Sequence, residues 1–267
     1  MRHFVLNESN YGKIKDESFD LAILPWGATE PHNYHLPYGT DTLETTYIAE
    51  TASAKASSNG ARVMVLPTIH LGMQNPGQIE IPFCLSASLN TQVSILKDIV
   101  ASLSVQGLKK LIILNGHGGN DFKPVIRDLY SELDDFFIGL TNWYELLDNS
   151  KYFDIPGDHA GEMETSIMMY AFPDLVQEVS ASGVGEANNF KAECMKNKEV
   201  WTPRNWSKVS LDTGIGNPKF ASAEKGKIFL DDLTNRLSEI FIELCELDVN
   251  NMYKGDYKLK PIKVVDF

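Results

Sequence analysis

The chain has 267 residues, of which 43% are hydrophobic and 22% are charged, and its formal net charge is −12. This length and composition are typical of a globular protein with a sizeable hydrophobic core. The acidic surplus argues against binding to nucleic acid or to anionic membrane surfaces, because both attract basic proteins. The sequence contains three widely spaced cysteines, no apolar run of about 18 residues and no apolar signal segment, so we expect a cytoplasmic protein without disulfides.

Short apolar runs alternate with longer segments of helical periodicity along most of the chain. The apolar runs predict strands at residues 18–25, 62–67, 110–114 and 136–141. Helices are predicted at residues 42–57, 90–103 and 122–133, with a short helix within 158–171 and a long one at about 222–247. This alternation predicts an α/β fold of three layers (α/β/α), in which a mostly parallel central sheet lies between two layers of helices.

A single domain covering residues 1–267 is the simplest organisation, because no linker, internal repeat or low-complexity segment divides the chain. Residues 181–220 are polar and lack a regular period. We expect them to form an irregular insertion that serves as a lid or a subunit interface. The tail after Asn250 is basic and is expected to be extended.

Acidic and imidazole side chains cluster directly after the first predicted strand. Glu30 and His32 are two residues apart, and Asp41 follows after a loop. In an extended segment, residues i and i+2 point to the same side, so Glu30 and His32 would face one point in space. Carboxylate and imidazole are ligands that Zn²⁺, Mn²⁺ and Fe²⁺ take up. The alternative is a solvated polar loop in which Asp41 caps the next helix.

A glycine-rich turn that contains His117 follows the third predicted strand. Ligands of open α/β sheets bind at the carboxyl ends of the strands, and this rule places His117 at the same edge as the acidic-imidazole loop. Two alternatives stay open. In the first, His117 is a buried histidine that is hydrogen-bonded to the backbone. In the second, the glycines at 116–119 bind phosphate. No Lys-Ser/Thr pair and no G-x-G-x-x-G pattern accompanies these glycines.

The third polar segment runs from residue 158 to 166 and contains His159, Glu162 and Glu164. An imidazole next to a metal site is suited to moving protons. At about 100° per residue, a helical His159 would share its face with Glu162 and point roughly 140° away from Glu164. Glu164 therefore reaches the site only if His159 lies in the loop before the helix, and we predict that it does. The alternative is helix chemistry alone, with Asp158 as the N-cap and both acids favoured by the helix dipole.

Together the three segments resemble the sequence pattern of the creatininase (creatinine amidohydrolase) family. The matching stretches are residues 25–41, 115–120 and 159–166, followed by 214–218 and 221–226 before the last helix. The resemblance implies the creatininase-like fold and hydrolysis of a C–N bond in a small cyclic or linear amide. It also implies a homo-oligomer such as a hexamer.

The resemblance further implies one or two divalent metal ions per chain, which would be zinc, manganese or iron. Glu30, Asp41 and His117 match the ligands of one ion. His32 and a bridging Asp41 match ligands of the second ion.

The same resemblance assigns catalysis to His159, which would protonate the leaving nitrogen, together with Glu164 as the acid of that motif. Two departures from the family pattern bear on the chemistry. The family's Tyr-Glu pair after the motif histidine is replaced by Gly118 and Gly119, so the second metal site would be completed by Glu164 or water, or be absent. A Phe-Pro-Gly-Thr run is replaced at residues 81–86. Both changes predict a substrate other than creatinine.

Two other functions stay open on the sequence alone. The first is a non-catalytic metal- or ligand-binding protein that keeps the fold but does not turn over a substrate. The second is a phosphate- or nucleotide-binding α/β protein. His35 is expected to support the site through a hydrogen bond rather than as a ligand. Trp143 is expected to be a core or interface residue rather than one that stacks on a substrate.

Overall fold

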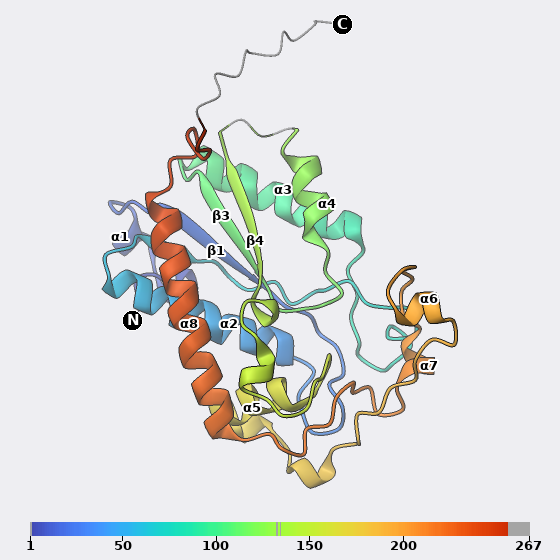
Figure 1. Ribbon diagram of the computed structural model, residues 1–267. Helices are drawn as coiled ribbons and strands as arrows, with labels where there is room; N and C mark the ends of the chain where they lie inside the picture. Colours follow the sequence, from blue (N-terminus) through green and yellow to red (C-terminus); the bar gives the residue numbers. More distant parts are fainter. Residues whose placement is uncertain (1, 132, 134, 256–267) are drawn as a thin grey trace, which may run out of the picture.

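The computed structural model describes residues 2–131, 133 and 135–255, and Figure 1 shows how the elements are arranged. Parallel strands form a four-stranded sheet in the order β2-β1-β3-β4. The strands are β1 (Leu21–Trp26), β2 (Val63–Val65), β3 (Lys110–Asn115) and β4 (Phe137–Asn142). Every residue of β1, β2 and β3 is buried, which explains why these strands are largely apolar runs in the sequence.

Helices connect the strands and follow the last of them. The longer helices are α2 (Thr40–Ser58), α3 (Leu89–Val105), α4 (Phe122–Leu129), α5 (Glu162–Ala171) and α8 (Ala223–Glu246). The short ones are α1 (Tyr11–Ile14), α6 (Glu193–Lys196) and α7 (Trp206–Val209). Single 3₁₀ turns occur at Leu6–Glu8, Trp143–Glu145, Asn149–Lys151, Pro173–Leu175 and Val179–Ala181. Within the described residues, every helix is too short or too polar to cross a lipid bilayer.

The helices cover both faces of the sheet, as the alternating sequence pattern predicts (Figure 1). On one face, α2 and α8 pack on Leu21 and Ile23 of β1, and α5 packs against both of these helices. On the opposite face, α3 and α4 pack on Leu24 and Ile113. Successive side chains of β1 therefore enter two separate cores. The predicted three-layer α/β/α fold with a parallel sheet is confirmed.

Several predicted boundaries differ from the observed ones. α4 ends at Leu129 rather than near residue 133, although Leu133 still packs against the core. β2 is reduced to three residues, at an edge of the sheet. Residues 181–220 are mostly irregular, as expected, but they carry α6 and α7 and bring the buried Trp206 into the interior. The predicted extended tail lies outside the described residues from residue 256 on.

The carboxyl ends of β1 and β3 lie side by side, because Trp26 pairs with Asn115 in the parallel register. The polar segments at 27–41 and 116–121 leave the sheet from these two ends and begin at the same edge. The first turn of α2 holds Asp41, and α5 packs against α2. The fold therefore brings all three polar segments of the sequence to one place.

Candidate metal centre

The loop between β1 and α2 folds tightly against the first turn of that helix. Gly27 permits this approach, because a Cβ atom there would lie 2.6 Å from the backbone nitrogen of Thr42. Asn33 adopts a left-handed conformation with a φ of 57°, which asparagine tolerates better than most residues. Asp41 does not cap α2: the N-cap residue is Gly39, and Asp41 lies inside the first turn with its carboxylate directed at His117.

The turn after β3 is held by its two asparagines. Asn115 donates its side-chain amide to the backbone carbonyl of His117, and its side-chain oxygen accepts a hydrogen bond from Asn120. Gly116 leaves room for Thr45, since a Cβ atom at this position would lie 1.8 Å from the Thr45 hydroxyl oxygen. The N-G-H-G-G-N spacing thus supports His117 from both sides and allows the turn to approach α2 closely.

Glu30, Asp41 and His117 form one compact, buried group. His117 Nδ1 lies 3.0 Å from Glu30 Oε1 and 3.0 Å from Asp41 Oδ2. His117 Nε2 lies 2.9 Å from the carbonyl oxygen of Met73, to which it must donate, because a carbonyl only accepts. In the neutral imidazole, Nδ1 would then present a lone pair to two carboxylates. A cation bound between Nδ1 and the two carboxylates would remove that repulsion, because all three groups would then act as its ligands.

His32, Asp41 and Glu164 form a second group next to the first. His32 Nε2 is 2.8 Å from Asp41 Oδ1 and 3.9 Å from Glu164 Oε1. His32 Nδ1 lies 3.0 Å from the carbonyl oxygen of Glu30, so this ring also donates to the backbone and turns its other nitrogen to carboxylates. Asp41 joins the two groups, because Oδ1 faces His32 and Oδ2 faces His117.

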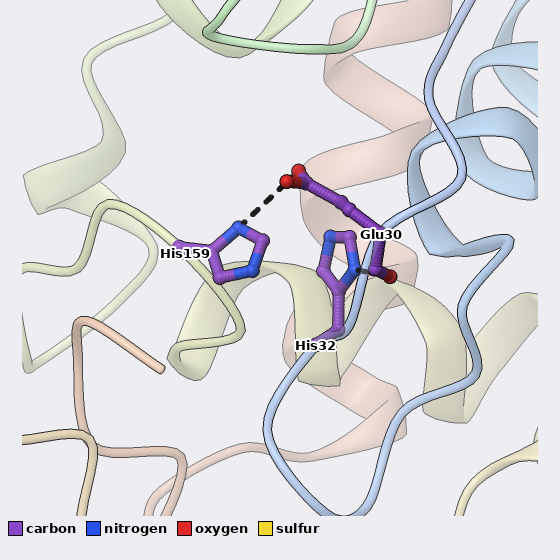
Figure 2. Close-up of side chains that lie close together, drawn as sticks. All are labelled: Glu30, His32 and His159. Carbon is purple, nitrogen blue, oxygen red and sulfur yellow. Dashed lines mark hydrogen bonds and ion pairs between the residues drawn. The ribbon is translucent and has the colours of Figure 1, made fainter. Parts of the chain in front are cut away.

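His159 forms a third group with Glu30 and His32, and Figure 2 shows the three side chains turned toward one another. His159 Nε2 donates to the carbonyl oxygen of Pro31 at 2.8 Å, and Nδ1 lies 3.7 Å from Glu30 Oε1. Its ring centroid is 4.1 Å from that of His32, and Trp206 packs perpendicular to it with the centroids 5.3 Å apart. One hydrogen bond and two aromatic neighbours therefore fix the orientation of this imidazole.

The prediction that His159 precedes the helix is confirmed. α5 begins at Glu162, and Ala160 turns the chain before it in a left-handed conformation with a φ of 52°. Glu162 is directed away from the three groups, to Lys225. Glu164 instead faces the second group, and its other oxygen accepts a hydrogen bond from the backbone amide of Ala160.

The interpretation of Asp158 as a helix cap is wrong. The N-cap residue of α5 is Gly161, and Asp158 pairs with Arg204 at 2.5 Å. The Arg204 guanidinium also lies 5.1 Å from the ring centre of Trp206. This contact ties the irregular segment at 181–220 to the rim of the polar site.

Burial and neighbouring charges shift the pKa values of the central residues strongly. Burial lowers the pKa of His32, but Asp41 and Glu164 outweigh it and raise the pKa to about 10. Burial also lowers the pKa of His117, yet Glu30 and Asp41 hold it well above the ordinary value. Burial raises the pKa of Asp41, but His32 and His117 lower it below its usual range. Without a metal ion, protons on these histidines therefore offset the carboxylate charges.

A cavity of about 110 Å³ opens onto this centre. The residues that line it include the members of the centre Glu30, Asp41, His117, His159 and Glu164. They also include Trp143, Tyr144, Asn149, Asp158 and Met163. Gly118 also borders it, and a Cβ atom at that glycine would meet no atom within 4 Å. The side chains of the centre are thus accessible to a small molecule from one side.

Some residues that support the site carry no signal in the sequence. Gln78, from the irregular stretch after β2, donates its amide to Glu30 Oε2 at 2.5 Å and accepts from the Asn75 backbone amide at 2.8 Å. Trp206, which packs on the ring of His159, comes from a segment without a regular period. A lone glutamine or tryptophan in such a stretch does not indicate a site, and only the tertiary fold brings these residues in.

The expectation that Trp143 is a core residue is confirmed, and His35 is likewise buried. His35 lies 2.8 Å from the hydroxyl of Thr165 and belongs to none of the three groups. Trp143 is a buried core residue whose indole N–H donates to the Thr45 hydroxyl at 3.0 Å. It also borders the cavity, so it combines packing with a place in the cavity wall.

The surroundings of the glycine-rich turn disfavour a phosphate site. Phosphate binding at a helix start needs free backbone amides in a positive field. Here the side chain of Asp121 already accepts a hydrogen bond from one amide of the first turn of α4, that of Lys123. His117 faces two carboxylates, which would repel an anion.

Known proteins are similar to this chain in sequence and in fold. A family model described as "Creatininase: Creatinine amidohydrolase" matches residues 7–241. A 3-dehydro-scyllo-inosose hydrolase of Thermotoga maritima is 27% identical over 252 residues, which cover 85% of this chain and 78% of that relative.

Solved structures extend the similarity to the fold. A Bacteroides fragilis protein assigned as a creatinine amidohydrolase is 46% identical, with a TM-score of 0.89 over 95% of this chain and 100% of its own. A mutant creatininase of the Zn–Zn type is 20% identical, with a TM-score of 0.76 over 92% of this chain and 100% of its own. At that level of identity the second similarity shows a common fold alone.

Proposed function

This chain belongs to the creatininase family, and on that premise we propose that it is a metal-dependent amidohydrolase that cleaves a C–N bond in a small molecule. The observation that carries the proposal is the position of Asp41. Its two carboxylate oxygens face His32 and His117 separately, at 2.8 Å and 3.0 Å. A carboxylate shared in this way is suited to bridge two cations, as in hydrolases with two metal ions.

The first divalent ion would be held by Glu30, Asp41 and His117. The second would share Asp41 and add His32 and Glu164. This set of oxygen and imidazole donors suits zinc, manganese or iron, and we propose one of these metals. When bound, such ions supply Lewis acidity toward the amide carbonyl and toward water. Backbone carbonyls fix the outer nitrogen of both histidines, which supports the assignment of the inner nitrogens as ligands.

We assign proton transfer to His159. Its Nε2 is occupied by the carbonyl of Pro31, so a proton can be gained and lost only at Nδ1, next to the cavity. A proton released by the attacking water would be carried at this nitrogen to the leaving amine. Glu164 keeps Oε1 toward the centre while the Ala160 amide holds its other oxygen, and it would orient that water.

The cavity supports a compact substrate without an anionic group. Its volume of about 110 Å³ accommodates a small molecule or the reacting end of a longer one. Among the described residues that line it, none is a lysine or an arginine, the side chains that usually recognise phosphate and carboxylate. Gly118 leaves open space where creatininase carries a tyrosine, so the acyl or ring part of the substrate would differ from creatinine.

We further propose that the chain forms one domain, works in the cytoplasm and assembles as a homo-oligomer such as a hexamer. Trp201 and Leu211 in the segment at 181–220 are 83% and 96% exposed, and apolar surface of this kind supports contact between subunits. Light scattering on the purified protein tests the assembly, and a monomer at micromolar concentration would contradict it.

The test of the activity is a screen with cyclic amides, formamides and short peptides before and after treatment with a chelator. We expect hydrolysis of at least one class, loss of the activity on chelation, and recovery when zinc or manganese is added back. Bound metal without turnover of any amide would favour the non-catalytic binding protein instead. Turnover that survives complete removal of the metal would refute the proposed mechanism.

A further inference from the structure

Glu44 is a buried carboxylate to which the sequence motifs assign no role. It lies on α2, three residues after Asp41, so the two side chains leave the helix on the same side. Glu44 is fully buried, with an exposed fraction of 0%. Neither of its oxygens accepts a hydrogen bond from any described residue. Buried carboxylates are normally paired or hydrogen-bonded, because leaving one without a partner destabilises the folded protein.

The charged neighbours of Glu44 are acidic and do not compensate it. Burial, followed by the charges of Glu164 and Asp41, holds the pKa of Glu44 well above its ordinary value. Asp41 and Glu164 are two members of the second group, in which His32 supplies the imidazole. A carboxylate placed beside this group with no partner of its own is complementary to a cation.

The second group offers three protein ligands, which leaves at least one coordination position open. It offers one imidazole and two carboxylates, and one of these carboxylates is shared with the first group. After His117, the turn that follows β3 supplies no side chain to the second group, because it continues with Gly118 and Gly119. A Cβ atom at Gly119 would lie 2.2 Å from the carbonyl oxygen of Met73, so this turn has no room for one there.

We propose that Glu44 is a ligand of the second metal ion, which it binds together with His32, Asp41 and Glu164. This proposal rests on the proposed metal-dependent function and adds a residue to its site. With Glu44, the centre contains four carboxylates, those of Glu30, Asp41, Glu44 and Glu164. Two divalent ions carry four positive charges, so the charges balance when the histidines are neutral.

Coordination would bring the Glu44 carboxylate closer to the group than it now lies. The three groups whose ligand atoms lie within 4.8 Å of one another do not include Glu44. Since no hydrogen bond holds the carboxylate in place, turning it toward Asp41 breaks no interaction with a described residue.

The proposal is tested by counting and titrating metal ions in the full-length Glu44→Gln variant. Glu162→Gln is the matched control, because Glu162 is an equally buried glutamate that pairs with Lys225 on the other side of α5. Zinc or manganese is titrated into chelated protein against a competing chelator, and bound metal is counted by elemental analysis. We expect two ions in the wild type and in the control. In Glu44→Gln we expect the second ion to bind about 100-fold more weakly or to be lost.

Thermal unfolding in the presence of chelator shows whether the variant folds. Glu44→Gln removes a buried carboxylate without a partner, so the metal-free variant should melt at or above the wild-type temperature. On addition of metal, its melting temperature should rise less than that of the wild type. Equal affinity for the second ion in wild type and Glu44→Gln would overturn the proposal, as would a wild type that binds one ion. A wild type that binds no metal would refute the proposed function as well.

Discussion

Metal binding should release protons, and their number follows from the charges of the centre. In the metal-free protein His32 has a pKa of about 10, and that of His117 is well above its ordinary value. Both rings are therefore protonated near neutral pH, whereas a metal-binding imidazole must be neutral. The pKa values of Glu30 and Asp41 are lowered, so these two carboxylates are already ionised and release nothing. Loading both ions should release at least two protons per chain.

This count predicts a steep dependence of affinity on pH. Each released proton raises the binding constant about tenfold per pH unit, so the product of the two constants should rise at least about 100-fold between about pH 7 and about pH 8. Calorimetric titration of zinc or manganese into chelated protein, in two buffers of different ionisation enthalpy, gives the proton number directly. Release of no protons, with tight binding unchanged across this range, would refute the assignment of both histidines.

The stability of the chelated protein gives an independent check. The pKa of His32 is raised from 6.5 to about 10 in the folded state, so protonation contributes stability that is fully present below about pH 6.5. That contribution is lost as the pH rises toward about 10. The melting temperature of the chelated protein should therefore fall over this interval, while that of the metal-loaded protein falls less. A chelated protein that becomes more stable over the same interval would contradict the charge balance described here.

Four substitutions separate the roles of neighbouring residues. Asp41→Asn should weaken the binding of both ions, each by at least about tenfold, whereas Glu30→Gln should weaken the binding of one. Elemental analysis of the bound metal distinguishes the two outcomes. His159→Ala should keep the bound metal and lower kcat by about 10²- to 10⁴-fold, and loss of the metal would show that His159 is a ligand instead. Gly116→Ala should destabilise the protein by about 1–3 kcal/mol, because the new Cβ atom would lie 1.8 Å from the Thr45 hydroxyl oxygen. Urea unfolding measures this change, and an unchanged midpoint would argue against the close packing.

The layers of the fold could be predicted because the strands are short, apolar and separated by helical segments. The register that sets Trp26 beside Asn115 follows from parallel pairing, and it explains why polar segments far apart in sequence meet. The end of α4 could not be predicted, because Leu133 keeps the apolar spacing of a helix although the helix ends at Leu129. Residue types alone do not distinguish a helical turn from a loop that buries the same side chain.

The juxtaposition of Glu30, Asp41 and His117 could be predicted, since all three residues follow strand ends. Gln78 could not, because it comes from an irregular stretch and reaches Glu30 only through the tertiary fold. Glu44 is hidden for a different reason. On a helix, a single acidic residue normally indicates a solvent-exposed position, and only its complete burial reveals that it lies inside.

The measurement that tests the central claim most directly is the metal content of the protein purified without chelator, for the wild type and Glu30→Ala side by side. A metal-dependent amidohydrolase with the centre described here should contain one or two equivalents of zinc, manganese or iron per chain, sharply reduced in the variant. Absence of metal from both proteins, even after reconstitution, would contradict the claim and favour a scaffold that binds other ligands.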